Sequence, residues 1–175
     1  MKMIRNMAIC IGVILLSVPL VHAQDLSKYR QFSLGTSLAE VSKQIDQHPQ
    51  DAVVIQQGPA MIQQLEWWPV SLNILTWPEP VQRVSFSFYN HTLYKIVADY
   101  GSDATVGLTA ADMIAAISAA YGPVNKAGAK AGLPSGAAYG AAEPIACWED
   151  LQYSATLSRE SFLNSFQMIV LAKRA

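Results

Sequence analysis

The chain has 175 residues, of which 51% are hydrophobic and 14% are charged, and its formal net charge is −1 at neutral pH. Its basic residues are scattered, and only Lys173 and Arg174 are adjacent. A nucleic-acid-binding surface needs clustered positive charge. We therefore expect neither nucleic acid nor an anionic membrane surface as a partner.

Residues 1–23 have the pattern of an export signal. A positively charged start is followed by an apolar run over residues 8–20, and small side chains precede Gln24. The run contains a proline and is shorter than the ~18–20 apolar residues that cross a bilayer. We expect cleavage near Ala23–Gln24, a secreted or periplasmic protein without a stable membrane anchor, and one domain over residues 24–175.

Cleavage would remove one of the two cysteines. Cys10 lies early in the apolar run and follows Ile9, so it lacks the setting of a lipid-attachment cysteine. Cys147 then has no partner for an internal disulfide, and the fold depends on its core, which is feasible for about 150 residues. Between Ala146 and Trp148, Cys147 reads as a buried small hydrophobic residue. A free reactive thiol is the alternative.

Two helix starts carry capping boxes. In a capping box the hydroxyl of the first residue accepts a hydrogen bond from the backbone amide three residues later, and the carboxylate of that later residue accepts one from the backbone amide of the first. Ser37 and Glu40 form the first, and Thr109 and Asp112 form the second with Asp in place of the usual Glu or Gln. Gly122 ends the second helix. An apolar stripe follows each start: Leu38, Val41 and Ile45, then Met113, Ile114, Ile117 and Tyr121.

Strand patterns follow each helix. After the first helix come residues 61–67, 81–89 and 92–100, and the last two form the clearest hairpin, with its turn at Asn90–His91. In this hairpin Val84, Phe86 and Phe88 alternate with Arg83, Ser85 and Ser87. After the second helix come residues 146–158 and 165–173.

These elements predict an α+β fold of two helix-then-antiparallel-strand units, about 32–100 and 107–173, with the helices packed on one face of an antiparallel sheet. The similarity of the units favours a tandem pseudo-repeat, and a chance match of two common capping boxes is the alternative. A stretch rich in Gly, Ala and Pro, residues 124–144, reads as a flexible loop.

The chain lacks the usual marks of catalysis. It has no Gly-x-Ser-x-Gly elbow and no phosphate-cradling glycine loop. His48 and His91 read as solvated loop residues, without the spacing of metal ligands. We expect no catalytic residue, no metal site and no cofactor. The alternative is a small exported hydrolase that uses dispersed carboxylates, namely Asp99, Glu149 and Asp150.

Aromatic residues are the better functional lead. Trp67, Trp68 and Trp77 lie close in sequence. Because neighbouring residues of a strand point to opposite faces, Trp67 and Trp68 cannot both be buried if one face of the sheet is wet. We expect the exposed one, with Trp77, to contact a partner. Packing beneath the loop of residues 69–80 is the alternative.

The motif Phe32-Ser-Leu-Gly-Thr-Ser-Leu-Ala-Glu-Val41, followed by strands and a second helix start, resembles the BamE/SmpA-type outer-membrane assembly lipoproteins and the tandem β-lactamase inhibitor proteins. Residues 86–89, 94–97 and 107–113 resemble uncharacterised exported bacterial proteins more closely. The chain departs from the assembly lipoproteins because it has no lipidated cysteine. Such modules are generally binding proteins, so the resemblance implies binding rather than catalysis.

The sequence thus favours an exported, non-catalytic binding or envelope-assembly module whose partner is an envelope or secreted protein. Two alternatives stay open. One is the carboxylate-based exported hydrolase, and the other is an inhibitor of a secreted enzyme.

Overall fold

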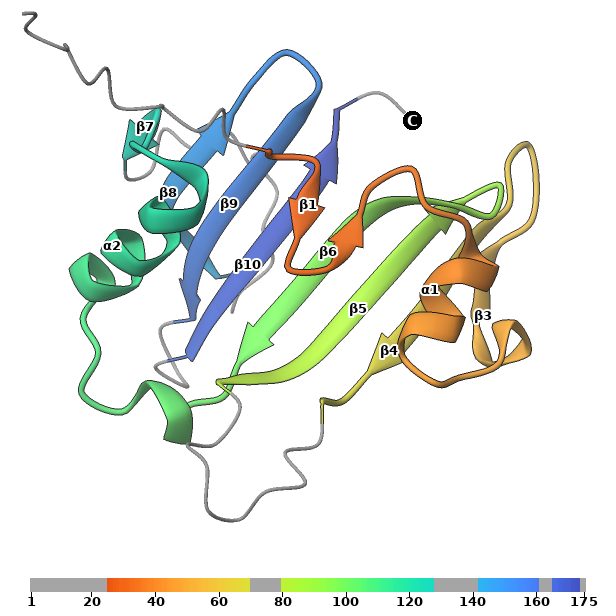
Figure 1. The fold of residues 1–175 in the computed structure, drawn as a ribbon, viewed down its shortest axis with the longest axis horizontal. Helices are drawn as coiled ribbons and strands as arrows, with labels where there is room; N and C mark the ends of the chain where they lie inside the picture. The colour runs from red at the N-terminus through yellow and green to blue at the C-terminus, as the bar shows by residue number, and fades with distance from the viewer. Residues whose placement is uncertain (1–24, 70–79, 128–141, 161–164, 174–175) are drawn as a thin grey trace, which may run out of the picture.

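The computed structural model describes residues 25–69, 80–127, 142–160 and 165–173 (Figure 1). The expected export signal at residues 1–23 lies outside these ranges. So do Trp77 and most of the 124–144 stretch.

One antiparallel sheet of eight strands forms the body of the molecule. Its spatial order is β3-β4-β5-β6-β10-β9-β8-β7, so β6 and β10 meet at the centre and β3 and β7 lie at the edges. The strands are β3 (Val53–Gln56), β4 (Ile62–Trp67), β5 (Val81–Tyr89), β6 (Thr92–Tyr100), β7 (Lys126–Ala127), β8 (Glu143–Glu149), β9 (Tyr153–Glu160) and β10 (Ser165–Ala172).

A second, two-stranded antiparallel sheet consists of β1 (Lys28–Tyr29) and β2 (Phe32–Ser33). In Figure 1 these strands lie in front of the eight-stranded sheet. Two short α-helices, α1 (Leu38–Gln44) and α2 (Ala110–Tyr121), and two 3-10 turns, η1 (Pro49–Asp51) and η2 (Asp103–Thr105), complete the described elements.

Both predicted capping boxes are confirmed. The Ser37 hydroxyl accepts a hydrogen bond from the Glu40 amide at 3.3 Å, and the Thr109 hydroxyl accepts one from the Asp112 amide at 3.2 Å. Gly122, with φ of 72°, stops α2. Its carbonyl also accepts a hydrogen bond from the indole nitrogen of Trp148 at 2.9 Å, which ties the end of α2 to the sheet.

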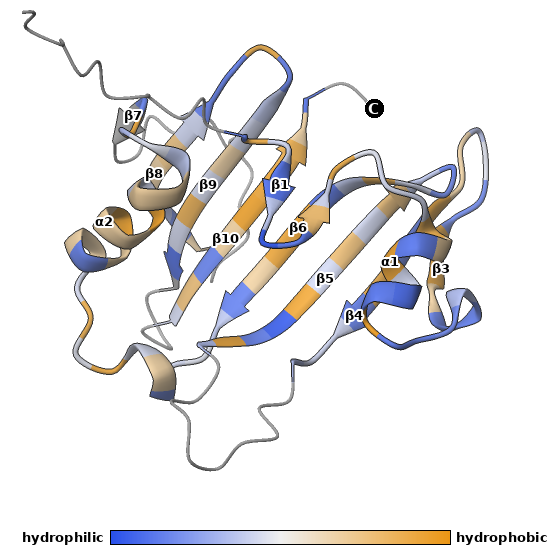
Figure 2. Cartoon of the chain, in the orientation of Figure 1, coloured by the Kyte–Doolittle hydropathy of each residue, from blue (hydrophilic) through white to orange (hydrophobic). Residues whose placement is uncertain are grey.

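The first face of the sheet carries the core. One row of paired residues crosses six strands, and each of its side chains is at most 1% exposed. The row consists of Leu65, Phe86, Ile96, Val170, Ala155 and Trp148. Phe32 of β2 covers it, with ring centroids 4.7 Å from Phe86 and 5.6 Å from Trp67. The alternation of apolar and polar residues along much of β5 is visible in Figure 2.

The second face is built from smaller and more polar side chains. The row next to the core row consists of Glu66, Ser85, Val97, Ile169, Thr156 and Cys147. Cys147 is a buried free thiol that accepts a weak hydrogen bond from the Thr156 hydroxyl at 3.6 Å. Its burial agrees with the simpler of the two interpretations of this cysteine.

Tyrosines join β1 to the sheet and to α2. The hydroxyls of Tyr29 and Tyr100 lie 3.4 Å apart, and the Tyr121 hydroxyl donates to the Lys28 carbonyl at 2.5 Å. Burial raises the pKa of Tyr29 and that of Tyr121 above the ordinary value of 10.0, because the charged phenolate is poorly solvated there.

The predicted fold class, α+β with two helix-then-strand units, is wrong. The structure is mostly β: an eight-stranded antiparallel sheet and a two-stranded sheet dominate it, and its described α-helices have only 7 and 12 residues. From α1 only Leu38, Val41 and Ser42 are buried, and from α2 only Met113 and Tyr121. The sequence patterns identified the helices but gave them too much weight, because the strands supply most of the core.

The strands themselves were predicted unevenly. Residues 81–89 and 92–100 form β5 and β6 with the predicted bounds. The predicted strand 146–158 is instead two strands, because a turn at residues 150–152 reverses the chain. The ends of the 124–144 stretch form β7 and the start of β8 rather than loop.

Candidate functional site

A groove opens at the end of the sheet where β5 turns into β6 and β8 turns into β9. Its volume is about 960 Å³. We call it the tyrosine groove, since Tyr89, Tyr94 and Tyr153 contribute to its wall. Its other lining residues are Leu34, Gly35, Asn90, Thr92, Leu93, Asp150, Leu151, Gln152 and Ala172.

The β5–β6 turn forms one wall of the tyrosine groove. Asn90 and His91 have φ of 45° and 67°, the left-handed pair that suits a tight two-residue hairpin. The Asn90 side chain accepts a hydrogen bond from the Met61 amide at 3.0 Å, and the Gly35 amide donates to the Leu93 carbonyl at 2.7 Å. These bonds hold the turn against β4 and against the segment that precedes α1.

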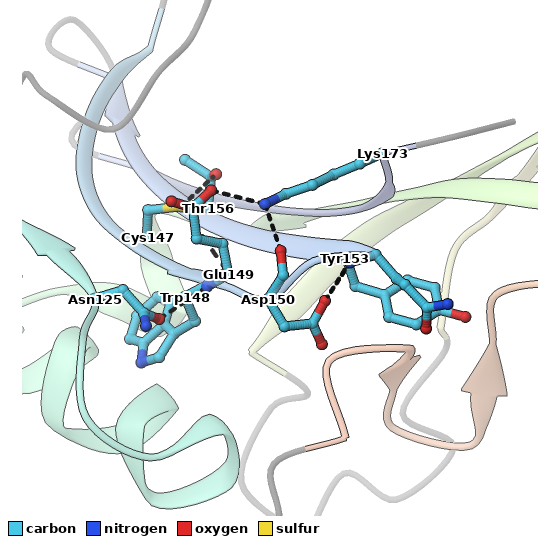
Figure 3. Close-up of polar contacts among 9 residues, drawn as sticks. Asn125, Cys147, Trp148, Glu149, Asp150, Tyr153, Thr156 and Lys173 are labelled. Carbon is cyan, nitrogen blue, oxygen red and sulfur yellow. Dashed lines mark hydrogen bonds and ion pairs between the residues drawn. The ribbon is translucent and has the colours of Figure 1, made fainter.

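The β8–β9 turn also lines the groove, and Figure 3 shows its polar contacts. One carboxylate oxygen of Asp150 accepts hydrogen bonds from the amides of Gln152 at 2.7 Å and Tyr153 at 2.6 Å. The Lys173 ammonium donates to the Asp150 carbonyl at 2.6 Å and pairs with Glu149 at 2.9 Å. The turn is therefore fixed before any partner arrives, which lowers the entropy cost of binding.

Leu151 lies at the tip of this turn with 92% of its surface exposed. An isolated exposed leucine is ordinary, but this one lines a groove together with three tyrosines. Tyrosine offers an apolar ring and a hydrogen-bonding hydroxyl with few rotatable bonds. The arrangement suits contact with an apolar side chain of another molecule.

A smaller hollow of about 520 Å³, which we call the Trp68 hollow, lies at the other end of β5, β6 and β10. Its lining includes Trp68, which is 53% exposed. Arg83 donates to one oxygen of Asp99 through Nε at 2.9 Å and Nη2 at 2.7 Å, and Gln167 donates to the other oxygen at 2.8 Å. The polar groups of this hollow are thus largely engaged with one another.

The structure separates the three tryptophans that the sequence singled out. Trp67 is half-buried and packs edge-on against Phe32. Trp68 is exposed in the Trp68 hollow, and Trp77 lies outside the described residues. Their joint role as a partner-binding surface stays a prediction.

Of the three carboxylates of the hydrolase alternative, Glu149 and Asp150 are adjacent in one turn, and Asp99 lies apart from them. Asp99 lines the Trp68 hollow and Asp150 lines the tyrosine groove, at opposite ends of the sheet. Glu149 pairs with Lys173. Within the ranges that the structure covers, no three His, Cys, Asp or Glu side chains gather in a way that could hold a metal ion.

Sequence reasoning missed the tyrosine groove. The predicted strand over residues 146–158 includes Leu151 and Tyr153, whereas Leu151 stands in a turn. The available signal was Asp150, because an aspartate that accepts from amides two and three residues later is typical of a turn.

Comparison with protein-family models, curated proteins and solved structures finds no match to this chain. Its resemblance to exported bacterial modules stays a prediction. In the part of the chain that the structure describes, no helix has the length and apolar character needed to span a membrane.

Proposed function

We propose that the protein is an exported, non-catalytic binding module that holds an apolar side chain of an envelope or secreted protein in the tyrosine groove. One observation carries this proposal. Leu151, at 92% exposure, stands beside three tyrosines on a turn that Asp150 and Lys173 hold in place. Export itself rests on the sequence pattern of residues 1–23.

The positions and contacts of the carboxylates favour binding over hydrolysis, because Asp99 lies at the opposite end of the sheet from Asp150 and Glu149 is paired with Lys173. General acid–base work on a glycan needs two carboxyl groups at a separation of ~5 to ~9.5 Å across one bond. One carboxylate oxygen of Asp150 accepts hydrogen bonds within the turn. The carboxylate of Asp99 accepts hydrogen bonds from Arg83 and Gln167. An inhibitor of a secreted enzyme remains a special case of the same proposal, in which the partner is an enzyme.

The experiment compares capture of envelope or secreted proteins by immobilised wild-type protein and by Leu151→Asp, with bound proteins quantified by mass spectrometry. The matched control is Val106→Asp, because Val106 is also exposed, at 76%, and lies outside the groove. We expect recovery of a specific protein to fall about tenfold or more with Leu151→Asp, as for loss of a central apolar anchor. Val106→Asp should behave as wild type.

Two results would contradict the proposal. Equal recovery by wild type and Leu151→Asp would remove the tyrosine groove as the contact. If recovery of the partner falls only in a third variant, Trp68→Ala, the partner contacts the Trp68 hollow instead. That result would agree with the sequence-based expectation that an exposed tryptophan contacts the partner. Adding the protein to assays of secreted enzymes separates the inhibitor case from simple binding.

A further inference from the structure

The outer edge of the sheet at β3 is apolar and uncharged. All four residues of β3 are exposed, and Val53, Val54 and Ile55 are 62%, 42% and 61% exposed. β3 pairs with β4 on one side and ends the sheet on the other. Its outer backbone groups therefore offer a template for a further strand.

The two edges of the sheet differ in how they discourage such pairing. Among the residues that the structure describes, β7 consists of Lys126 and Ala127. Short strands and lysines are the usual means of protecting an edge. β3 carries no charge and no proline, and a bulge in its pairing leaves Ile55 without a partner on β4.

The exposed side chains of β3 also restrict what could cover it. Val53 pairs with Gln64 and so belongs to the second face, whereas Val54 pairs with Gln63 and belongs to the first. An amphipathic strand would match only one of these faces. A strand with consecutive β-branched residues matches both, and β3 itself has that sequence.

We propose that β3 is a dimerisation edge that pairs antiparallel with β3 of a second copy of this chain. A two-fold axis perpendicular to the sheet reverses the strand direction and keeps each face continuous across the contact. The uncharged, β-branched side chains of the two β3 strands then lie opposite one another, which is a favourable cross-strand pairing. The contact closes after two copies, because each copy presents β3 once.

The contact is short, so the dimer is reversible and depends on concentration. The surface shares no lining residue with the tyrosine groove, and the proposal is independent of the proposed function.

The test is sedimentation velocity over a concentration series up to the limit of solubility. It uses the wild type, Val53→Lys, Val53→Glu, and an equal mixture of the two charged variants. The matched control is Val106→Lys, a lysine at another exposed valine. We expect wild type and the control to form a dimer, each charged variant alone to remain monomeric through like-charge repulsion, and the mixture to recover the dimer.

The mixture also guards against misfolding, because a misfolded variant cannot be rescued by an equally damaged partner. A wild type that stays monomeric throughout would overturn the proposal. So would undiminished dimers of both charged variants, an open-ended wild-type assembly, or a mixture that fails to associate.

Discussion

The two faces of the eight-stranded sheet are built on the same strands but differ in chemistry. On the first face, a row from Leu65 to Trp148 is almost fully buried beneath Phe32 and its neighbours. On the second face, the adjacent row mixes Glu66, serine, threonine and aliphatic residues. The ion pair of Arg83 and Asp99 lies beside that row.

This difference in chemistry means that the first face contributes most of the stability of the fold, whereas the second face contributes polar surface groups. Apolar area removed from water stabilises by roughly 25 cal/mol per Å², and the largest buried side chains lie on the first face or pack against it. Half-exposed ion pairs contribute about 0–1 kcal/mol. We therefore expect the loss of a large side chain on the first face to destabilise the protein far more than a change at an exposed residue of the second face.

The largest expected effect is that of Trp148→Ala. Trp148 is 0% exposed and donates to the Gly122 carbonyl, so its removal leaves a cavity and an unpaired acceptor. We expect the free energy of unfolding to fall by about 3–5 kcal/mol. Urea denaturation followed by circular dichroism measures this change.

Trp68→Ala is the matched control, since Trp68 is 53% exposed. It should change the free energy of unfolding by less than about 1 kcal/mol. Equal losses of unfolding free energy in the two variants would mean that the first face does not form the core.

A second effect appears at alkaline pH. Burial raises the pKa of Tyr29 and Tyr121 in the folded state, while both titrate near 10.0 when unfolded. Below that pH both states keep the protons, and their contribution is fully present. Above it only the unfolded state releases them, so stability falls by up to about 1.4 kcal/mol per pH unit for each tyrosine.

Tyr29→Phe removes one of these two groups. Urea midpoints measured from neutral pH to about pH 11 should therefore fall less steeply in Tyr29→Phe than in wild type. Parallel profiles for the two proteins would show that Tyr29 ionises as readily in the folded as in the unfolded state.

The sequence predicted this division of faces best where its period of two was regular. Val84, Phe86 and Phe88 lie on the buried face as the alternation required. It failed for the order of the strands in the sheet, because the pairing of β6 with β10 joins residues about 70 apart and leaves no local pattern. It also failed for β3, whose uncharged residues do not alternate.

The candidate site was harder to predict for a related reason. The tyrosine groove combines two turns that are distant in sequence, and only the sheet order brings Tyr89 and Leu151 to the same groove. The tryptophans were adjacent in sequence, yet Trp67 packs against Phe32 while Trp68 is exposed. Adjacency along a strand separates side chains, whereas turns at one end of a sheet collect them.

The smallest expected effect is that of Asp99→Asn on the second face. The variant keeps an oxygen for the Gln167 amide and weakens only the pair with Arg83, whose side chain is 44% exposed and still lies 3.8 Å from Glu66. We expect a loss below about 1 kcal/mol that shrinks as salt screens the pair. Urea denaturation at low and high salt measures both quantities. A loss of several kcal/mol, independent of salt, would show that the second face is as essential to folding as the first.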